Sequence, residues 1–326
     1  MAFNILEPGL ATTVQDRGRP GYYNVGIPQG GAMDQLSAEM ANSLVGNTGT
    51  EAVLECTYIG PKLVSDEDAV VAVTGAPVEV KINDVVQEQW ARLQLRAGDQ
   101  LSFGMLSGGT RYYIAVQGGI DVPSVLGSRS TYTLGAMGGF NGRALQAGDT
   151  VPVGAQHTPY DDVPSPARVD EAERPAFDRE VTVRVLPGLY DHRLTEDGLS
   201  TLLSAEWTLT PVADRMGLRY AGPELSWKPR QQPFGAGSDP SNIVDAGYAV
   251  GSIQVPGGKE PIILHRDAVS GGGYAMVATV ISADMDLLAR SAPGTTTAFR
   301  SVSMDEALQA RREMNERRAR IWEWAR

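Results

Sequence analysis

The sequence predicts a mainly β protein made of two antiparallel β-barrel domains with a few short helices. Its 326 residues are enough for two cores of ordinary size. The 37 glycines and 20 prolines stay below the level of a disordered chain and instead indicate frequent turns. Short apolar or alternating runs lie between these turns. Closure of such strands into barrels would remove their exposed edges.

The first half combines one predicted helix with several strands. A Gly- and Pro-rich loop precedes the helix, which is predicted over 33–45. Four apolar residues recur there at helical spacing: Met33, Leu36, Met40 and Leu44. Strands are predicted over 69–73, 78–82 and 111–116, where apolar runs end at Gly or Asn-Asp turns.

The second half follows a polar, Pro-rich stretch and also combines strands with short helices. Strands are predicted over 181–185, 252–255 and 261–264, and helices over 199–203 and 282–290. Ser282 is placed to cap the latter helix, and Ser303 with Glu306 matches a capping box that opens a charged C-terminal helix. Trp322 and Trp324 in this helix are expected to dock on the body of the chain, with docking on a partner as the alternative.

These patterns divide the chain into four segments. We expect an N-terminal β domain over 1–153, a linker over 154–178, a C-terminal barrel over 179–302 and a terminal helix over 303–326. The linker is assigned on its prolines and on the absence of apolar periodicity.

The charge balance argues against nucleic acid as a partner. The chain has 28 basic and 39 acidic side chains, a net charge of −11, and acidic surfaces repel phosphates. No run approaches the roughly 18 apolar residues of a membrane span, and the N-terminus lacks the regions of a signal peptide. The single cysteine, Cys56, lies in an apolar run and is expected to be buried. We therefore expect a cytoplasmic protein without an internal disulfide.

Several common catalytic signatures are absent from the sequence. It has no Walker-type phosphate loop, no Gly-x-Gly-x-x-Gly after a strand and no Gly-x-Ser-x-Gly elbow. The three histidines, His157, His192 and His265, are far apart, so no metal site is predicted. No lysine lies in an Ala-Met-Lys-Met-like context, so the chain is not expected to carry biotin itself. These negatives argue against a self-contained kinase, hydrolase or metalloenzyme.

Two segments of the first half combine arginine with glycines or hydroxyls. The loop over 13–34 contains Arg19, which could hold a carboxylate where glycines let a ligand approach the backbone. The segment 127–132 places Arg129 among consecutive hydroxyls that could donate to an oxyanion or carboxylate. The alternative in both cases is a structural turn, with an Asp16–Arg19 pair in the first and hydroxyls bonded to their own backbone in the second.

The second half holds the densest set of polar groups. Arg215 lies in a turn-like Asp-Arg-Met-Gly segment. Further along follow Asn242, Asp245, Gln254, Asp267 and Tyr274, the last after a triple-Gly turn. Amides and ureas need both donors and acceptors, which Asn, Asp and Gln supply, so these residues could surround a small amide-like ligand. The alternative is a pair of hairpins whose turns use Asn, Asp and Gly for their backbone angles.

Taken together, the motifs resemble the family of allophanate hydrolase subunit 2 and the C subunit of 5-oxoprolinase, which is KipA-like and includes biotin-dependent carboxyltransferases. The matching stretches occur in order at 13–22, 31–34, 41–47, 118–120, 126–132, 214–217, 251–256 and 272–274. The resemblance covers nearly the whole chain up to about residue 302, and it rests on the number and order of the matches.

The resemblance implies a cyclophilin-like β-barrel and a companion chain. Members pair with a subunit 1 chain, similar to KipI or the B subunit of 5-oxoprolinase, and some also with a LamB/YcsF-type subunit. It further implies ATP bound through the complex, or carboxybiotin as a transient partner group, with the site in the second half. The family pattern Gln-Thr-Thr-Gly-Gly-Tyr-Pro-Lys corresponds here to 269–276, and Met276 replaces the lysine that would stabilise negative charge.

Two hypotheses follow. In the first, the chain is an enzyme subunit that opens 5-oxoproline with ATP or moves a carboxyl group onto a urea-like amide. Asp245 and Arg215 are then the catalytic candidates, and the substrate-binding candidates are Asn242, Gln254, Asp267, Tyr274, Arg129 and Arg19. In the second, the chain is a regulatory binding module of the KipA type that has lost its chemistry, as Met276 suggests.

Overall fold

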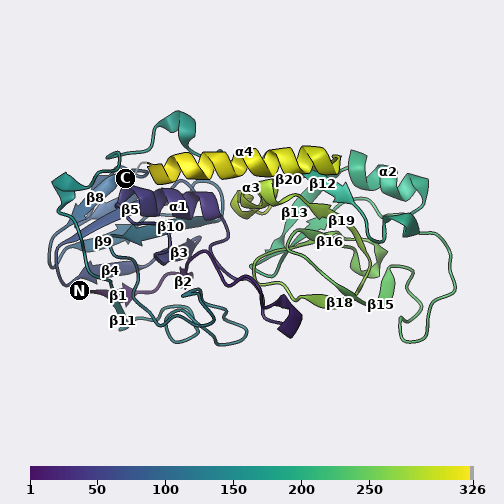
Figure 1. The fold of residues 1–326 in the computed structure, drawn as a ribbon, viewed down its shortest axis with the longest axis horizontal. Helices are drawn as coiled ribbons and strands as arrows, with labels where there is room; N and C mark the ends of the chain where they lie inside the picture. The colour runs from purple at the N-terminus through teal and green to yellow at the C-terminus, as the bar shows by residue number, and fades with distance from the viewer. Residues whose placement is uncertain (324–326) are drawn as a thin grey trace. The chain divides into compact units, whose positions relative to one another are not determined.

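A computed structural model describes residues 1–323, so the predicted docking of Trp324 lies outside the described residues. The described chain is mainly β, which confirms the predicted fold class. It divides into two compact units (Figure 1). Unit 1 comprises residues 1–19, 30–177 and those from 315 onward, and unit 2 comprises 20–29 and 178–314. This division differs from the predicted domain boundaries, because 154–177 belong to unit 1 and 20–29 to unit 2.

Unit 1 is built from two sheets. One has the strand order β11-β1-β4-β9-β6-β7 and the other the order β2-β3-β10-β5-β8. Their bounds are β1 Ala2–Glu7, β2 Ala11–Gln15, β3 Val53–Thr57, β4 Lys62–Ser65, β5 Ala69–Gly75, β6 Val80–Ile82, β7 Val85–Gln87, β8 Arg92–Leu95, β9 Gln100–Phe103, β10 Arg111–Val116 and β11 Thr150–Pro152. The pairs within them are antiparallel. Unit 1 therefore differs from the predicted barrel, because its strands divide between two separate sheets.

The core of unit 1 explains why its central strands read as continuous apolar runs. Residues from both sheets, among them Phe3, Leu54 and Leu101, form one buried cluster. The opposite face of the β10–β5 pair is covered by helix α1, Gln35–Leu44, in a second cluster. Because both faces are buried, β5 and β10 carry no exposed position. Helix α1 confirms the predicted helix, and the Asp34 carboxylate caps it by accepting from the Ser37 N–H.

Unit 2 contains a closed barrel with the strand order β12-β19-β16-β17-β14-β13-β20 (Figure 1). The bounds are β12 Glu180–Pro187, β13 Glu206–Ala213, β14 Gly217–Ala221, β16 Ser252–Gln254, β17 Ile262–Leu264, β19 Met276–Val280 and β20 Thr296–Ser301. A separate two-stranded ribbon is formed by β15, Asn242–Gly247, and β18, Gly271–Tyr274. The barrel is antiparallel except at one seam, where β12 and β20 run parallel from Glu180↔Thr296 to Val185↔Ser301. This seam is the one departure of the barrel from the predicted all-antiparallel arrangement.

The barrel interior is filled by alternating side chains and three aromatic rings. Phe299 on β20 lies between Trp207 and Tyr220, with ring centroids 6.2 and 6.1 Å away. All three are buried, and the Trp207 indole N–H donates to the Leu202 carbonyl at 3.1 Å. That carbonyl belongs to helix α2, Glu196–Ser204, so the aromatic cluster also holds this helix to the barrel.

Helix α3, Met285–Arg290, lies between the barrel strands β19 and β20 in the chain and follows a short 3-10 turn, Ser282–Asp284. The prediction that Ser282 caps this helix is wrong: no side chain caps either segment, and the Asp284 carboxylate instead accepts from the Arg184 backbone and guanidinium. Arg184 on β12 is partly buried, so its charge is stabilised by pairing with the Asp284 carboxylate, which is then not used to cap the helix.

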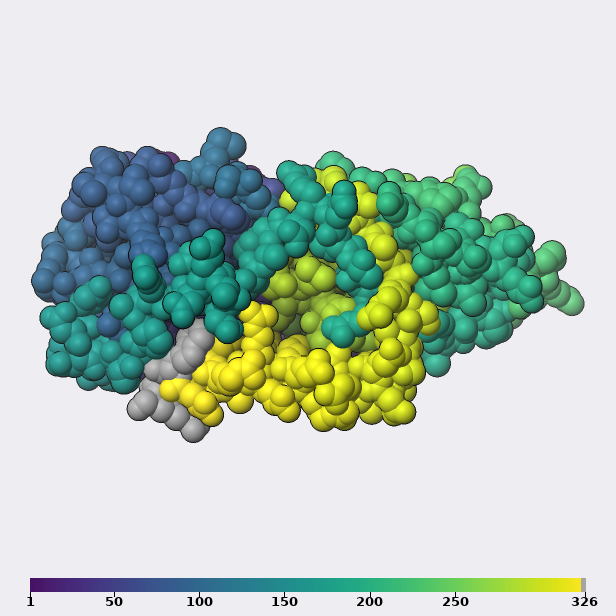
Figure 2. Space-filling view, turned by 90° about the horizontal axis from the view of Figure 1, so that it is seen from above, coloured from purple at the N-terminus to yellow at the C-terminus, as the bar shows by residue number. Residues whose placement is uncertain are grey.

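Helix α4, Met304–Glu323, begins at the predicted capping box. The Ser303 hydroxyl and N–H both bond the Glu306 carboxylate, and the Glu306 N–H returns a bond to the hydroxyl. Figure 2 shows side chains of this helix, in yellow, on the surface of the molecule. Its last turns belong to unit 1, where Trp322 is partly buried with the Arg17 guanidinium 5.1 Å from its ring centroid. Trp322 thus docks on the chain's own body, as expected.

Replacement of Phe299 by alanine is predicted to destabilise the protein by about 3–5 kcal/mol, since it removes a fully buried ring from between two others. Urea unfolding followed by tryptophan fluorescence measures the change. The same substitution at Phe234, which is fully exposed, serves as the matched control and should stay within about 0.5 kcal/mol. Equal effects at the two positions would contradict this account of the barrel core.

Candidate functional site

The centre of the candidate site is an ion pair between Arg215 and Asp267. The guanidinium meets both carboxylate oxygens, Nε to Oδ2 at 2.7 Å and Nη2 to Oδ1 at 2.9 Å. The side chains are only 14% and 4% exposed, so the two charges are largely removed from water. A bidentate pair of this kind fixes both direction and distance. Two of the predicted site residues are therefore joined directly.

The local chain explains why the pair forms here. Arg215 lies in the turn between β13 and β14, where the Asp214 carboxylate accepts from the Met216 and Gly217 N–H groups. Asp267 follows β17, and its own N–H donates to the Arg215 carbonyl at 2.9 Å. Backbone and side-chain bonds together lock the turn to the segment after β17. The pair is consequently a rigid part of one end of the barrel.

A cavity of about 250 Å³ lies beside the pair, within unit 2. Its wall includes the neighbours of both paired residues, Asp214 and Met216 on one side and Ala268 and Val269 on the other. Gln254, at the end of β16, also lines it. The Gln254 Oε1 atom is buried and has no hydrogen-bond partner among the described residues, so it is an unsatisfied acceptor at this cavity. Arg219, whose guanidinium reaches Glu260 at 3.2 Å, supplies the cationic group of this wall.

The β15–β18 ribbon carries three more of the predicted residues. Asn242 pairs with Tyr274 across the ribbon, and Asp245 lies exposed further along β15. Tyr274 is 41% exposed, and its backbone N–H and carbonyl both bond the Tyr248 hydroxyl at 2.8 Å. Figure 1 shows the ribbon on the side of the barrel away from α4.

Register connects the ribbon to the cavity. Tyr274 pairs with Asn242, and two residues later Met276 pairs with Gln254 on β16. The segment 274–276 therefore has Asn242 beside one end and Gln254 beside the other. None of the ribbon residues lines the cavity of Gln254, so the structure groups the predicted residues into two neighbouring sets. Arg215, Asp267 and Gln254 belong to the first set, and Asn242, Asp245 and Tyr274 to the second.

Arg19 and Arg129 belong to unit 1, whereas the residues of both sets belong to unit 2. Arg19 is 1% exposed and donates to the Ser130 carbonyl. The Arg129 guanidinium donates to the Val122 carbonyl at 2.9 Å. The Asp16 carboxylate accepts from the Ser128 hydroxyl and from the Arg129 N–H, both at 2.6 Å. Both arginines thus contribute to the structure of the loops that carry them, and their role in binding stays a prediction.

Sequence reasoning missed Arg193. This side chain is 5% exposed and donates to the Asn242 carbonyl at 2.9 Å and to the Pro240 carbonyl. Burial lowers the pKa of its guanidinium, with a further contribution from the positive charge of Arg230. Arg193 therefore anchors the start of β15 from a distance of 49 residues along the chain. No local pattern marks it, because a lone arginine in a 3-10 turn has no signature.

Tyr23 was also missed, although it lies in the predicted Gly-rich loop. It belongs to unit 2, and its phenol interacts electrostatically with Arg266 and Asp267. Burial is the main cause that raises its pKa to about 12, while the positive charge of Arg266 opposes the increase. Its hydroxyl is buried without a hydrogen-bond partner among the described residues.

Two further predictions concern single residues. Met276 is 6% exposed and packs with Tyr248, Leu264 and Ala268, so the position of the family lysine is here an apolar contact. Cys56 is fully buried, and burial raises the pKa of its thiol, as expected of a small hydrophobe. Within residues 1–323, no cluster of three or more metal-binding side chains occurs, and no helix is long and apolar enough to cross a bilayer.

Comparisons with known proteins give a consistent picture. Residues 25–301 match the family model of the carboxyltransferase domain, subdomain A and B. The C subunit of the Escherichia coli 5-oxoprolinase is 34% identical over 310 residues, covering 95% of this chain and 94% of that protein. The urea amidolyase of Lachancea kluyveri is 35% identical over 94% of this chain, and the crystal structure of the K. lactis urea amidolyase superposes with a TM-score of 0.91 at 33% identity over 98% of this chain.

The lengths of these relatives differ greatly. This chain covers only 17% of the Lachancea kluyveri urea amidolyase and 20% of the K. lactis urea amidolyase structure. It covers 25% of a urea carboxylase relative from Emericella nidulans. The chain therefore corresponds to one part of those large proteins, whereas it spans nearly the whole of the E. coli protein.

Substitution of Asp267 by asparagine is predicted to cost about 3–5 kcal/mol of stability, because it removes the carboxylate that pairs with the largely buried Arg215 guanidinium. Urea denaturation measures the loss. The matched control is Glu260→Gln, which breaks the more exposed Arg219–Glu260 pair and should cost no more than about 1 kcal/mol. A loss at Asp267 no larger than at Glu260 would show that the pair does not hold the turn in place.

Proposed function

Because the chain belongs to the carboxyltransferase subdomain A and B family, we propose that it is a subunit of an enzyme that acts on a small amide or lactam together with a companion chain. The observation that carries the proposal is the match to the C subunit of 5-oxoprolinase, which extends over 94% of that relative. We propose an ATP-dependent 5-oxoprolinase as the first candidate activity and a carboxyltransferase of the urea-carboxylating type as the alternative.

The cavity beside Gln254 suits a lactam in its chemistry. A lactam offers one N–H donor and one carbonyl acceptor, and the unpartnered Gln254 Oε1 is placed to accept from that N–H. The carboxylate of 5-oxoproline would meet the Arg219 guanidinium on the same wall. At about 250 Å³ the cavity is near the lower end of small-molecule sites, which favours a compact substrate.

In this proposal the ion pair positions the cavity wall. Arg215 and Asp267 neutralise each other, so their main contribution is to hold the turn and the segment after β17 at fixed separation. Stabilisation of negative charge at the lactam carbonyl would need a donor aimed at the oxygen. We propose Arg215, which lies between the lining residues Asp214 and Met216, as that donor, and Asp245 of the neighbouring ribbon, outside the lining, as the carboxylate for proton transfer.

The companion chains would supply the ATP chemistry. The residues that line the cavity lie on strands and turns, without the helix N-terminus that commonly holds phosphates. We therefore propose that ATP reaches the reaction through a subunit 1 chain similar to the B subunit of 5-oxoprolinase, with a LamB/YcsF-type chain as a further partner. Carboxybiotin would be the corresponding partner group in a carboxyltransferase. The proposed location of the complex is the cytoplasm.

A second candidate function is a regulatory binding module of the KipA type. Met276 favours it, because an apolar side chain cannot stabilise the negative charge that the family lysine would. In this case the barrel would hold a partner protein without performing chemistry.

Assay of the purified complex with its companion chains separates the two functions. Gln254→Ala is predicted to lower kcat/KM for ATP-dependent 5-oxoproline cleavage by at least about tenfold, since it removes an acceptor worth about 1–3 kcal/mol. Gln309→Ala on the exposed face of α4 is the matched control and should leave turnover unchanged.

Assembly must be followed in the same samples by size-exclusion chromatography. A complex that assembles, turns over 5-oxoproline and loses that activity in Asn242→Ala or Gln254→Ala excludes the regulatory function. A wild-type complex that assembles but turns over neither 5-oxoproline nor a biotin-dependent carboxylation would rule out the enzymatic one.

A further inference from the structure

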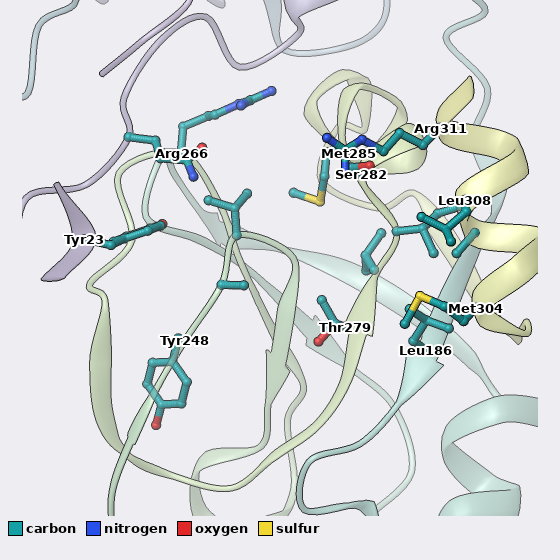
Figure 3. Close-up of a pocket in the computed structure, with 16 residues that line it drawn as sticks. Tyr23, Leu186, Tyr248, Arg266, Thr279, Ser282, Met285, Met304, Leu308 and Arg311 are labelled. Atoms are coloured by element: carbon teal, nitrogen blue, oxygen red, sulfur yellow. The ribbon is translucent and has the colours of Figure 1, made fainter. Parts of the chain in front are cut away.

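A second and larger cavity lies in unit 2 and includes Tyr23 and Arg266 in its wall. Its volume is about 490 Å³, within the usual range of small-molecule sites. It is lined by the 20–29 segment, by strands β12 and β19, by the α3 region and by the first turns of α4 (Figure 3). None of its lining residues contributes to the cavity beside Gln254.

One wall of this cavity is apolar. Leu186 comes from β12, and Met304 and Leu308 come from successive turns of α4 (Figure 3). Met304 and Leu308 remain 58% and 42% exposed, which is unusual for large apolar side chains on a helix that is otherwise highly charged. The cavity explains their position, because together with Leu186 they form a surface that an aliphatic group can cover.

The polar groups of the cavity are cationic or neutral. Arg266 and Arg311 enter from opposite walls, and the Arg311 guanidinium ends beside Ser282 (Figure 3). The described lining contains no aspartate or glutamate. Arg266 reaches the Asp286 carboxylate at 3.8 Å, whereas Arg311 has no hydrogen-bond or ion-pair partner among the described residues. In a chain with a net charge of −11, two arginines in a lining without carboxylates favour an anionic ligand.

Tyr23 provides an independent sign of a ligand. It lines the same cavity, and its hydroxyl is buried without a hydrogen-bond partner among residues 1–323. Leaving a buried hydroxyl unpaired is unfavourable, so such a group usually meets water or a ligand. A ligand oxygen in the cavity would accept from it.

We propose that this cavity binds a small carboxylate with an aliphatic body. The carboxylate lies between Arg266 and Arg311, and the aliphatic part covers Leu186, Met304 and Leu308. Arginine favours carboxylates because its planar donors match their two oxygens. The larger the apolar area that the ligand removes from water, the tighter it binds, which favours a chain of several carbons over acetate. This inference concerns a site separate from the cavity of the proposed function and does not depend on it.

Calorimetric titration of the purified chain with sodium hexanoate tests the site. Binding of hexanoate should exceed that of acetate, hexan-1-ol and hexylamine, because only hexanoate combines a negative charge with the six-carbon chain. Arg311→Gln should weaken hexanoate binding at least about tenfold, the loss expected for a charge-assisted hydrogen bond. Arg312→Gln is the matched control, since Arg312 lies on the same helix, outside the lining, and bonds to Gln309.

A second variant tests the apolar wall without disturbing the core. Met304→Glu places a carboxylate in the wall at an exposed position, and it should abolish hexanoate binding while the melting temperature stays close to that of the wild type. Failure of hexanoate to bind at millimolar concentration overturns the proposal, and so does an affinity for hexanol that equals that for hexanoate. An unchanged affinity in Arg311→Gln overturns it as well.

Discussion

The bidentate contact between Arg215 and Asp267 is the constraint on which the candidate site depends. Two charges that are largely withdrawn from water are stable only when they face each other with good geometry. This requirement fixes the β13–β14 turn against the segment after β17, and the residues next to each partner form the wall that also holds Gln254. Through the neighbouring Arg266 and the phenol of Tyr23, the same region reaches the larger cavity. The ion pair thus lies next to residues that line both cavities of unit 2.

Much of the fold could be predicted because it rests on local patterns. The apolar spacing around Met40 indicates α1, the alternation over 181–185 indicates β12, and the Ser303–Glu306 box begins α4 where expected. Ser282 failed as a cap for a reason that lies elsewhere in the chain, since Arg184 on β12 takes the Asp284 carboxylate. The parallel seam between β12 and β20 likewise joins segments that no local pattern relates.

The candidate site shows the same limit more strongly. Residue types alone pointed to Arg215, Asp267 and Gln254, and the structure brings these to one region of the barrel. Arg193 and Tyr23 have no signature in the sequence, because what distinguishes them is burial and the surroundings that tertiary structure provides. Arg19 and Arg129 carry the same chemistry as Arg215, yet they bond carbonyls in unit 1. Composition identifies groups able to bind a ligand, and only packing decides which of them face a cavity.

The parallel seam also has a consequence for how the protein is made. Strand β12 begins at residue 180 and its partner β20 ends at residue 301, so the barrel cannot close until the ribosome has synthesised the chain as far as β20. Until then at least one edge of β12 is unpaired, and other nascent strands can add to it. Because long-range pairing is slow, this interval exposes the chain to misassembly during translation. Early capture by a chaperone or by a companion chain would protect the open edge.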